Sequence, residues 1–192
     1  MNYKAILESG KVYHIYNRAI GNDKLFLTIK DYHYFLKKYK RYISPFVRLY
    51  AYCLIPNHFH LLARIKNIDE TPGNENLIQQ SFSNFFNSYT KSFNKIHFRY
   101  GKLFDQRYKR IRVDYEDYFN NLIYYIHRNP IHHGLTENFS DWQFSSYRNY
   151  IKYNNVLIAR EEIFNRFGGK NDFINFHKQN LNIDQLKKYT LE

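Results

Sequence analysis

The hydrophobic residues of this chain recur with two periods, and the order of these periods predicts the fold. Alternating or short apolar runs indicate strands, whereas apolar residues spaced three to four apart indicate helices. The segments with the strand pattern are 11–18, roughly 47–65 as two strands around a turn, and 109–113. The segments with the helical pattern are 28–43, 77–98 and 117–129, and we expect the last to stop at Pro130. Pro56 and Asn57 are turn residues, so the second and third strands should form a β-hairpin.

This order of strand, helix, two strands, helix and strand is typical of a ferredoxin-like α+β fold, in which a four-stranded antiparallel sheet carries two helices on one face. The helix at 117–129 follows the fourth strand and is additional to that arrangement. From Ile131 the chain has an aromatic patch around Trp142 and two or three short helical stretches. We therefore predict one domain at 1–135 and a helical extension at 136–192 that packs on it.

The composition suits a soluble globular protein with no membrane partner. Hydrophobic residues make up 44% of the 192 residues, and the mean hydropathy is −0.67. No stretch approaches the about 20 apolar residues of a membrane span. The first residues, Met1 to Glu8, contain no apolar signal region, so we expect a cytoplasmic protein. Cys53 is the single cysteine, which excludes an intramolecular disulfide and a zinc site with several cysteines.

The charge favours a polyanionic partner. The chain has 29 Lys and Arg residues against 17 Asp and Glu, a formal net charge of +12. Nucleic acid is the commonest polyanion of the cytoplasm, so this balance indicates nucleic-acid binding. The chain is also rich in Lys, Asn, Ile, Tyr and Phe, whose codons are rich in A and T. Genomic base composition is therefore an alternative source of part of the charge and of the 20% aromatic content.

Two histidines share one face of the second strand of the predicted hairpin. Alternate side chains of a strand point the same way, so His58 and His60 lie on one face, with Leu62 further along it. The opposite face, which begins with Phe59, is unbroken and apolar. We expect that face to be buried and the two imidazoles to be exposed, as a platform for a metal or a phosphate. A purely structural role of the pair is the alternative.

The helix predicted at 117–129 brings a tyrosine and an asparagine together. Tyr125 and Asn129 are four residues apart, so they are neighbours on the helix surface, at the flank of a buried stripe that includes Ile126. A phenol has a pKa of about 10 and becomes a useful nucleophile when a metal polarises the electrophile. Imidazole nitrogens plus an amide oxygen suit Mg²⁺ or Mn²⁺. With 20 tyrosines in the chain, simple packing is the alternative role of any one.

Several motifs resemble a known family. Pro56-Asn57-His58-Phe59-His60-Leu61-Leu62 resembles the His-hydrophobic-His motif of the HUH single-strand DNA nucleases. Tyr125-Ile126-His127-Arg128-Asn129-Pro130 resembles the Tyr-Ile-x-x-Asn-Pro element of the REP-associated tyrosine transposases, which are relatives of the single-tyrosine insertion-sequence transposases. The further matches are Tyr13 to Arg18, Gly101 to Phe104 and Trp142 to Tyr147. The resemblance covers roughly residues 10–150 in the order of the family.

The resemblance implies a DNA transposition-type reaction. Tyr125 would attack a phosphodiester of single-stranded DNA and form a 5′-phosphotyrosine intermediate. His58, His60 and Asn129 would hold a divalent metal, Mg²⁺ or Mn²⁺, and the substrate would be hairpin DNA with a single-stranded flank. The family acts as a monomer or a homodimer. The cationic residues that we expect to contact DNA are Arg18, Arg107, Lys109, Arg110, Arg112, Arg148 and Lys152, with solvated surface charge as the alternative role of each.

Two other functions remain open at this stage. One is a non-catalytic DNA-binding protein that retains the transposase fold, which would bind DNA in a salt-dependent way without a covalent adduct. The other is a metal-independent or RNA-directed phosphodiesterase that uses His58 and His60 as acid and base, which would work in the presence of a chelator.

Overall fold

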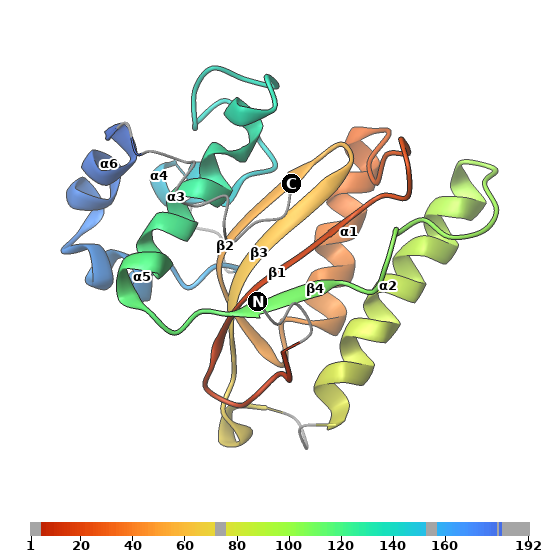
Figure 1. The fold of residues 1–192 in the computed structure, drawn as a ribbon, viewed down its shortest axis with the longest axis horizontal. Helices are drawn as coiled ribbons and strands as arrows, with labels where there is room; N and C mark the ends of the chain where they lie inside the picture. Colours follow the sequence, from red (N-terminus) through yellow and green to blue (C-terminus); the bar gives the residue numbers. More distant parts are fainter. Residues whose placement is uncertain (1–4, 72–75, 153–156, 180, 182–192) are drawn as a thin grey trace.

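A computed structural model describes residues 5–71, 76–152, 157–179 and 181, and it has the predicted mixture of strands and helices (Figure 1). The strands are β1 (Val12–Arg18), β2 (Val47–Ile55), β3 (His58–Ile65) and β4 (Lys109–Arg112). The helices are α1 (Ile29–Tyr42), a short 3-10 helix (Ile68–Glu70), α2 (Asn76–Ile96), α3 (Glu116–His132), α4 (Ser146–Ile151), α5 (Arg160–Phe167) and α6 (Lys170–Lys178). No helix among these is long and apolar enough to cross a membrane.

The four strands form one antiparallel sheet in the order β2-β3-β1-β4. This is the ferredoxin-like order, so the predicted α+β fold is confirmed. The register places Tyr16 of β1 opposite His60 on one side and opposite Lys109 on the other. Side chains of directly opposite residues share a face, so these three point to the same side of the sheet.

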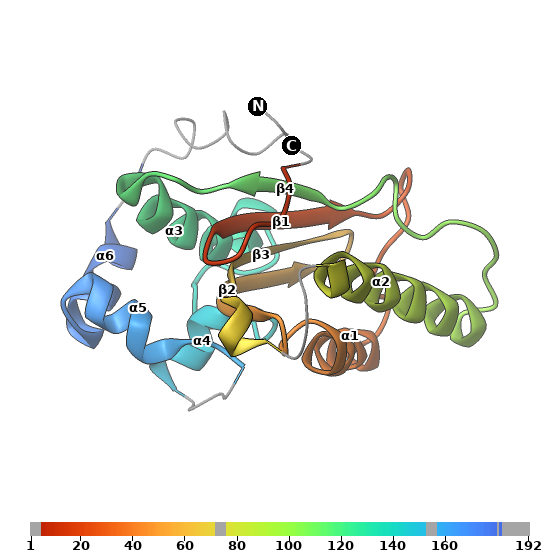
Figure 2. The ribbon, with the colours of Figure 1, turned by 90° about the horizontal axis from the view of Figure 1, so that it is seen from below.

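Helices α1 and α2 cover the apolar face of the sheet, where they also contact each other (Figure 2). The Phe59 ring lies 5.1 Å from the ring of Phe35 on α1 and 5.9 Å from that of Phe86 on α2. Thr28 and Asp31 form a capping box that starts α1. The sequence pattern therefore placed this core correctly.

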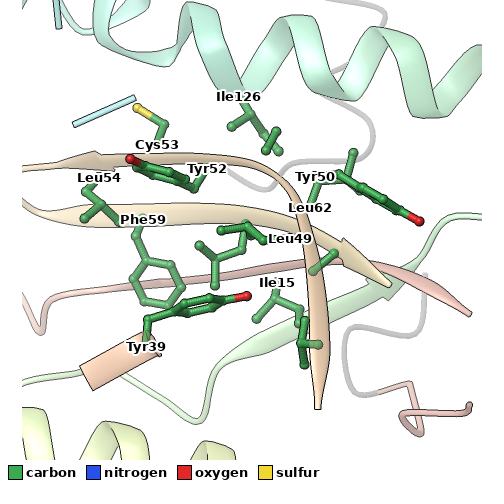
Figure 3. Close-up of a cluster of buried hydrophobic side chains, with 14 of the residues drawn as sticks. Ile15, Tyr39, Leu49, Tyr50, Tyr52, Cys53, Leu54, Phe59, Leu62 and Ile126 are labelled. Carbon is green, nitrogen blue, oxygen red and sulfur yellow. The ribbon is translucent and has the colours of Figure 1, made fainter. Parts of the chain in front are cut away.

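Helix α3 covers the other face of the sheet and contacts β2 and β3. Figure 3 shows Phe59 and Tyr39 on one side of the strands and Ile126 of α3 on the other. Strand β3 is thus buried on both faces, and the exposed fractions of His58 and His60 are 7% and 1%. The expectation of two exposed imidazoles was wrong, because period-two alternation does not reveal that a third helix packs on the polar face.

Helix α3 continues through Pro130, contrary to the expectation that it stops there. A proline inside a helix loses the hydrogen bond from its own nitrogen to the carbonyl four residues earlier. Pro130 lies in the last turn, and the following turn still closes, because His133 N–H donates to the carbonyls of Asn129 and Ile131. The loss is one hydrogen bond near the end of the helix, where the ladder is incomplete in any case.

The part of the chain after residue 135, called the tail below, lies along the free edge of β2 where the structure describes it. Leu54 N–H donates to the Phe144 carbonyl at 3.0 Å, and Trp142 Nε1–H donates to the Leu54 carbonyl at 2.8 Å. Further along, Ala159 N–H donates to the Leu49 carbonyl at 2.8 Å. An uncovered edge strand presents unpaired backbone groups that invite pairing with other chains. The tail satisfies these groups and closes the edge.

Candidate active site

The site begins with the histidine pair on β3. The rings of His58 and His60 lie 5.0 Å apart between centroids and are nearly perpendicular, at 86°. Strand geometry brings alternate side chains to the same face, which is why a single intervening Phe59 is enough to pair them. Both rings lie beneath α3, so they face a protein wall on that side and not bulk solvent.

Helix α3 brings the predicted tyrosine and asparagine to this pair. The Asn129 Oδ1 atom lies 3.1 Å from His58 Nε2, although the two residues are 71 positions apart in the sequence. The Tyr125 ring meets the His60 ring edge-on at 5.5 Å between centroids. Asn129 Nδ2–H points to the Tyr125 hydroxyl at 3.5 Å, a long contact within the helix. Helix α3 thus lies across the sheet face that carries both histidines.

The donor atoms around His58 fit a divalent cation. Its Nε2 faces Asn129 Oδ1 at 3.1 Å, and its Nδ1 faces Asn57 Oδ1 at 3.0 Å. A neutral imidazole carries one N–H and donates to only one of these oxygens. With Nδ1 donating to Asn57, Nε2 and Asn129 Oδ1 are two electron-pair donors that face each other. Neighbouring ligands of an octahedral ion at about 2.1 Å are roughly 3.0 Å apart, close to the spacing observed.

The third protein ligand of such a cation would have to be an amide. Within the residues that the structure describes, no three His, Cys, Asp or Glu side chains gather so as to hold a metal. The set His58, His60 and Asn129 therefore depends on the carboxamide oxygen. An oxygen ligand beside two nitrogens favours Mg²⁺ or Mn²⁺ over a soft metal such as copper(I).

A cavity of about 170 Å³ opens next to the histidines. Its wall includes two cationic side chains, Arg18 and Lys109, and one carboxylate, Asp105. The remaining lining residues are Tyr16, Asn17, Asn57, His58, His60, Gln106 and His133. Tyr125 and Asn129 are not among these described wall residues; they lie buried at 3% and 1% exposure. The described wall of the cavity therefore reaches the histidine pair but not the phenol.

A larger cavity of about 590 Å³ adjoins the first one. The two share Asn17, Asp105 and Gln106 in their walls. The larger cavity lies between α2 and the segment before β4, and its wall adds cationic and aromatic side chains. Those side chains are Phe86, Lys102, Phe104, Arg107, Tyr108 and Arg110. Cations beside aromatic rings are the surroundings that a single nucleic-acid strand prefers.

Comparison with known proteins agrees with the sequence motifs. No protein-family model matches the chain. A protein of Haemophilus influenzae with the provisional name REP-associated tyrosine transposase is 28% identical over 158 residues, which are 79% of this chain and 88% of that protein. The solved structure of a REP-associated tyrosine transposase bound to a REP hairpin shares the fold, with a TM-score of 0.58 and 18% identity over 79% of this chain and 85% of that one. The chain is thus similar in sequence to one protein that carries this name and similar in fold to another.

The seven cationic residues that were expected to contact DNA fall into separate groups. Arg18 and Lys109 lie at the smaller cavity, and Arg107 and Arg110 lie at the larger one. Arg112 is bound by two carboxylates, Asp114 at 2.6 Å and Glu8 at 3.1 Å. Arg148 lies on α4, and the exposed Lys152 is the residue that caps that helix. The structure thus gathers four of the seven around the two joined cavities.

The site also contains residues that the comparison of sequence motifs did not single out as functional. Tyr16 lines the smaller cavity, and the ring of His133 lies 4.9 Å from that of His58. Each carried a signal in the sequence. Tyr16 is on the same strand face as His14, and His133 is four residues after Asn129, which places it on the same side of a helix. Because the helix was expected to stop at Pro130, His133 was not predicted to lie beside Asn129.

Proposed function

We propose that this protein is a metal-dependent single-stranded DNA endonuclease and strand transferase that acts on hairpin-forming DNA in a transposition-type reaction. One observation carries the proposal. Tyr125 and Asn129 of α3 contact His60 and His58 of β3 on one face of the sheet. The related structure was solved with a REP hairpin, which supports hairpin DNA as the substrate. All four residues come from one chain.

The proposed cleavage step is a transesterification. The Tyr125 hydroxyl oxygen attacks the phosphorus of a phosphodiester, and the bond from phosphorus to the 3′ oxygen breaks. The phenolic proton is lost to solvent, and the leaving 3′ oxygen takes up a proton. The products are a 5′-phosphotyrosine and a free 3′-OH. Attack of a 3′-OH on the phosphotyrosine reverses the step, joins two strands and regenerates the phenol.

The residues of the site have separate roles in this proposal. His58, His60 and Asn129 would hold a Mg²⁺ or Mn²⁺ ion, which would polarise the oxygens of the scissile phosphate. The Asn129 amide also lies 3.5 Å from the Tyr125 hydroxyl and so restrains the direction of the phenol. Arg18 and Lys109 line the cavity beside the histidines, where their charge would hold the phosphates that flank the cleaved bond.

One observation favours the second candidate, a non-catalytic DNA-binding protein with the transposase fold. The Tyr125 side chain is 3% exposed, and the described wall of the cavity does not include it. For cleavage, the phenol has to become accessible to a bound phosphate. A binding protein would not need an accessible phenol. The two candidates differ in one measurable product, the covalent adduct.

The test is adduct formation with the full chain. A single-stranded hairpin oligonucleotide from the source genome, labelled at its 3′ end, is incubated with Mn²⁺, and denaturing electrophoresis separates protein-linked label. The wild type should retain the label, because the phosphotyrosine holds the 3′-terminal fragment. Tyr125→Phe should form no adduct, because phenylalanine lacks the hydroxyl oxygen that would attack the phosphorus. Chelation of the metal should abolish the adduct as well.

The matched control is Tyr124→Phe. Tyr124 is the neighbouring residue on α3, but its hydroxyl donates to the Gln179 carbonyl at 2.9 Å, away from the histidines. This variant should form the adduct at the wild-type rate. An adduct that maps to Tyr16 or to any tyrosine other than Tyr125 would overturn the assignment. Salt-dependent binding with no adduct in any variant would favour the second candidate.

A further inference from the structure

His14 of β1 is hydrogen-bonded to one of the proposed metal ligands. Its Nε2 atom lies 2.9 Å from His60 Nδ1, and the His14 side chain is fully buried. In the β1–β3 register His14 is opposite Leu62, while His60 is opposite Tyr16. His14 and His60 are therefore diagonal neighbours on one face, a distance that two imidazoles can bridge.

The ring of His60 is also fixed by stacking. The His14 and Tyr16 rings lie 4.7 Å apart at 24°, and the His14 and His60 rings lie 5.1 Å apart at 20°. Tyr16 stacks on His60 in turn, at 5.6 Å and 27°. On the remaining side, the Tyr125 ring meets His60 edge-on. A half-turn of the His60 ring would break the hydrogen bond and sweep through this packed group.

We propose that His14 is a positioning residue that presents Nε2 of His60 as the ligand atom for the metal, an inference that rests on the metal-dependent function proposed above. The same arrangement holds for the other histidine of the pair. Asn57 Oδ1 lies 3.0 Å from His58 Nδ1, and His58 Nε2 faces Asn129. Both histidines thus have Nδ1 held by a neighbour. Partners of this kind fix the tautomer of a ligating imidazole and raise its basicity.

If His60 Nε2 is the ligand atom, the hydrogen bond to His14 has only one direction. A ligand nitrogen must offer a lone pair, so His60 carries its proton on Nδ1 and donates it to His14 Nε2. His14 then accepts at Nε2 and carries its own proton on Nδ1. Both imidazoles are neutral in this arrangement. Without an acceptor at position 14, the Nδ1–H tautomer of His60 loses its stabilisation and the Nε2–H tautomer, which cannot bind a metal through that atom, becomes populated.

The experiment uses the full chain and two readouts besides activity. His14→Phe keeps an aromatic ring to stack on Tyr16 but removes the acceptor nitrogen. Nitrogen-15 NMR of the metal-free protein should show His60 with its proton on Nδ1 in the wild type and a mixture of tautomers in the variant. Titration with Mn²⁺ should show a 10- to 100-fold weaker affinity in the variant, the typical loss for such a partner.

Two further variants complete the test. His14→Gln retains an acceptor oxygen and should recover most of the Mn²⁺ affinity, and the exposed His33→Phe should leave it unchanged. A His60 tautomer or a Mn²⁺ affinity that is the same in wild type and His14→Phe would overturn the role of His14. Wild-type Mn²⁺ binding that depends on His60, together with no adduct at Tyr125, would instead overturn the proposed function and leave the role of His14 standing.

Discussion

Phe98 has a left-handed backbone conformation, with φ at 51°, and its side chain is 90% exposed. A residue with a Cβ atom is strained in this region by roughly 1–2 kcal/mol, whereas glycine is not. Because the side chain is exposed, its removal sacrifices no buried apolar contact. Part of the relief is offset by the greater freedom of glycine in the unfolded chain.

Phe98→Gly should therefore raise the free energy of unfolding by about 0.5–1 kcal/mol. Urea denaturation measures this directly. Phe98→Ala is the control, because alanine keeps the Cβ atom and the strain. Equal stability of all three proteins would mean that the left-handed conformation costs nothing here.

At the residue scale, the sequence predicted single-element relationships and missed those that depend on pairing between elements. The spacing of His58 and His60 and that of Tyr125 and Asn129 follow from strand and helix periods alone. The hydrogen bond between His14 and His60 depends on the register of β1 against β3. A shift of that register by one residue would point His14 away, and local sequence does not fix it.

At the scale of elements, a series of hydrogen bonds connects α6 and α4 of the tail to His127 of α3 and to Tyr52 of β2. His177 Nδ1–H donates to the Phe173 carbonyl at 2.8 Å, so His177 Nε2 accepts, and His127 Nδ1–H donates to it at 2.9 Å. His127 Nε2 then accepts from the Ser146 hydroxyl at 2.7 Å. Ser146 Oγ accepts in turn from Tyr52 N–H at 2.9 Å. With both histidines neutral, each carries its proton on Nδ1, and the Ser146 hydroxyl, which also lies 3.2 Å from the Tyr52 carbonyl, donates to His127.

This series of hydrogen bonds makes the stability depend on pH. Burial lowers the pKa of His177 from its ordinary value near 6.5 to about 4. Its described neighbours on α3 and α4 are His127, Tyr124 and Tyr147, and burial next to His177 also lowers the pKa of His127. Below pH 6.5 the unfolded chain takes up protons that the folded chain refuses, so the stabilisation is lost as the pH falls from 6.5 toward 4.

From His177 alone, we expect the free energy of unfolding to fall by roughly 2 kcal/mol between pH 7 and pH 5. Urea denaturation at the two pH values measures this fall. His177→Gln should show a smaller fall than the wild type, and the exposed His33→Gln should match the wild type. If His177→Gln and the wild type lost equal stability, the buried histidines would not be the source.

Two features at the element scale could not be predicted from the sequence pattern. The extent of α3 past Pro130 depends on how the last turn closes, which a rule about proline does not specify. The path of the tail along the β2 edge depends on contacts such as Tyr52 to Ser146, which are 94 positions apart. Short helical stretches with few apolar residues carry no information about where they dock.

At the scale of the whole molecule, the net charge of +12 matters for binding where it is concentrated. Lys109 lines the cavity beside the histidines, whereas Arg112, three residues later on the same strand, is held by Asp114 and Glu8. A cation that contacts a phosphate releases a counterion on binding, and one that is already neutralised by carboxylates does not.

Lys109→Gln should therefore weaken binding of single-stranded hairpin DNA and reduce the slope of log affinity against log salt by about 1. Arg112→Gln should change the slope by much less. Fluorescence anisotropy over a series of salt concentrations measures both, with Tyr125→Phe as the background so that cleavage does not interfere. Equal changes in the two variants would contradict the placement of the DNA at the cavities.

The tail that closes the edge of β2 is also the last part of the described chain to be synthesised. Ser146 follows Tyr52 by 94 residues, which takes roughly 5–20 s at the rates of translation. During that interval the edge of β2 has no cover, and α3, which emerges before the tail, has no support on its outer side. The sheet is complete once β4 has emerged, before the segment that covers the β2 edge, and the rate of translation determines how long that edge stays open to pairing with other chains.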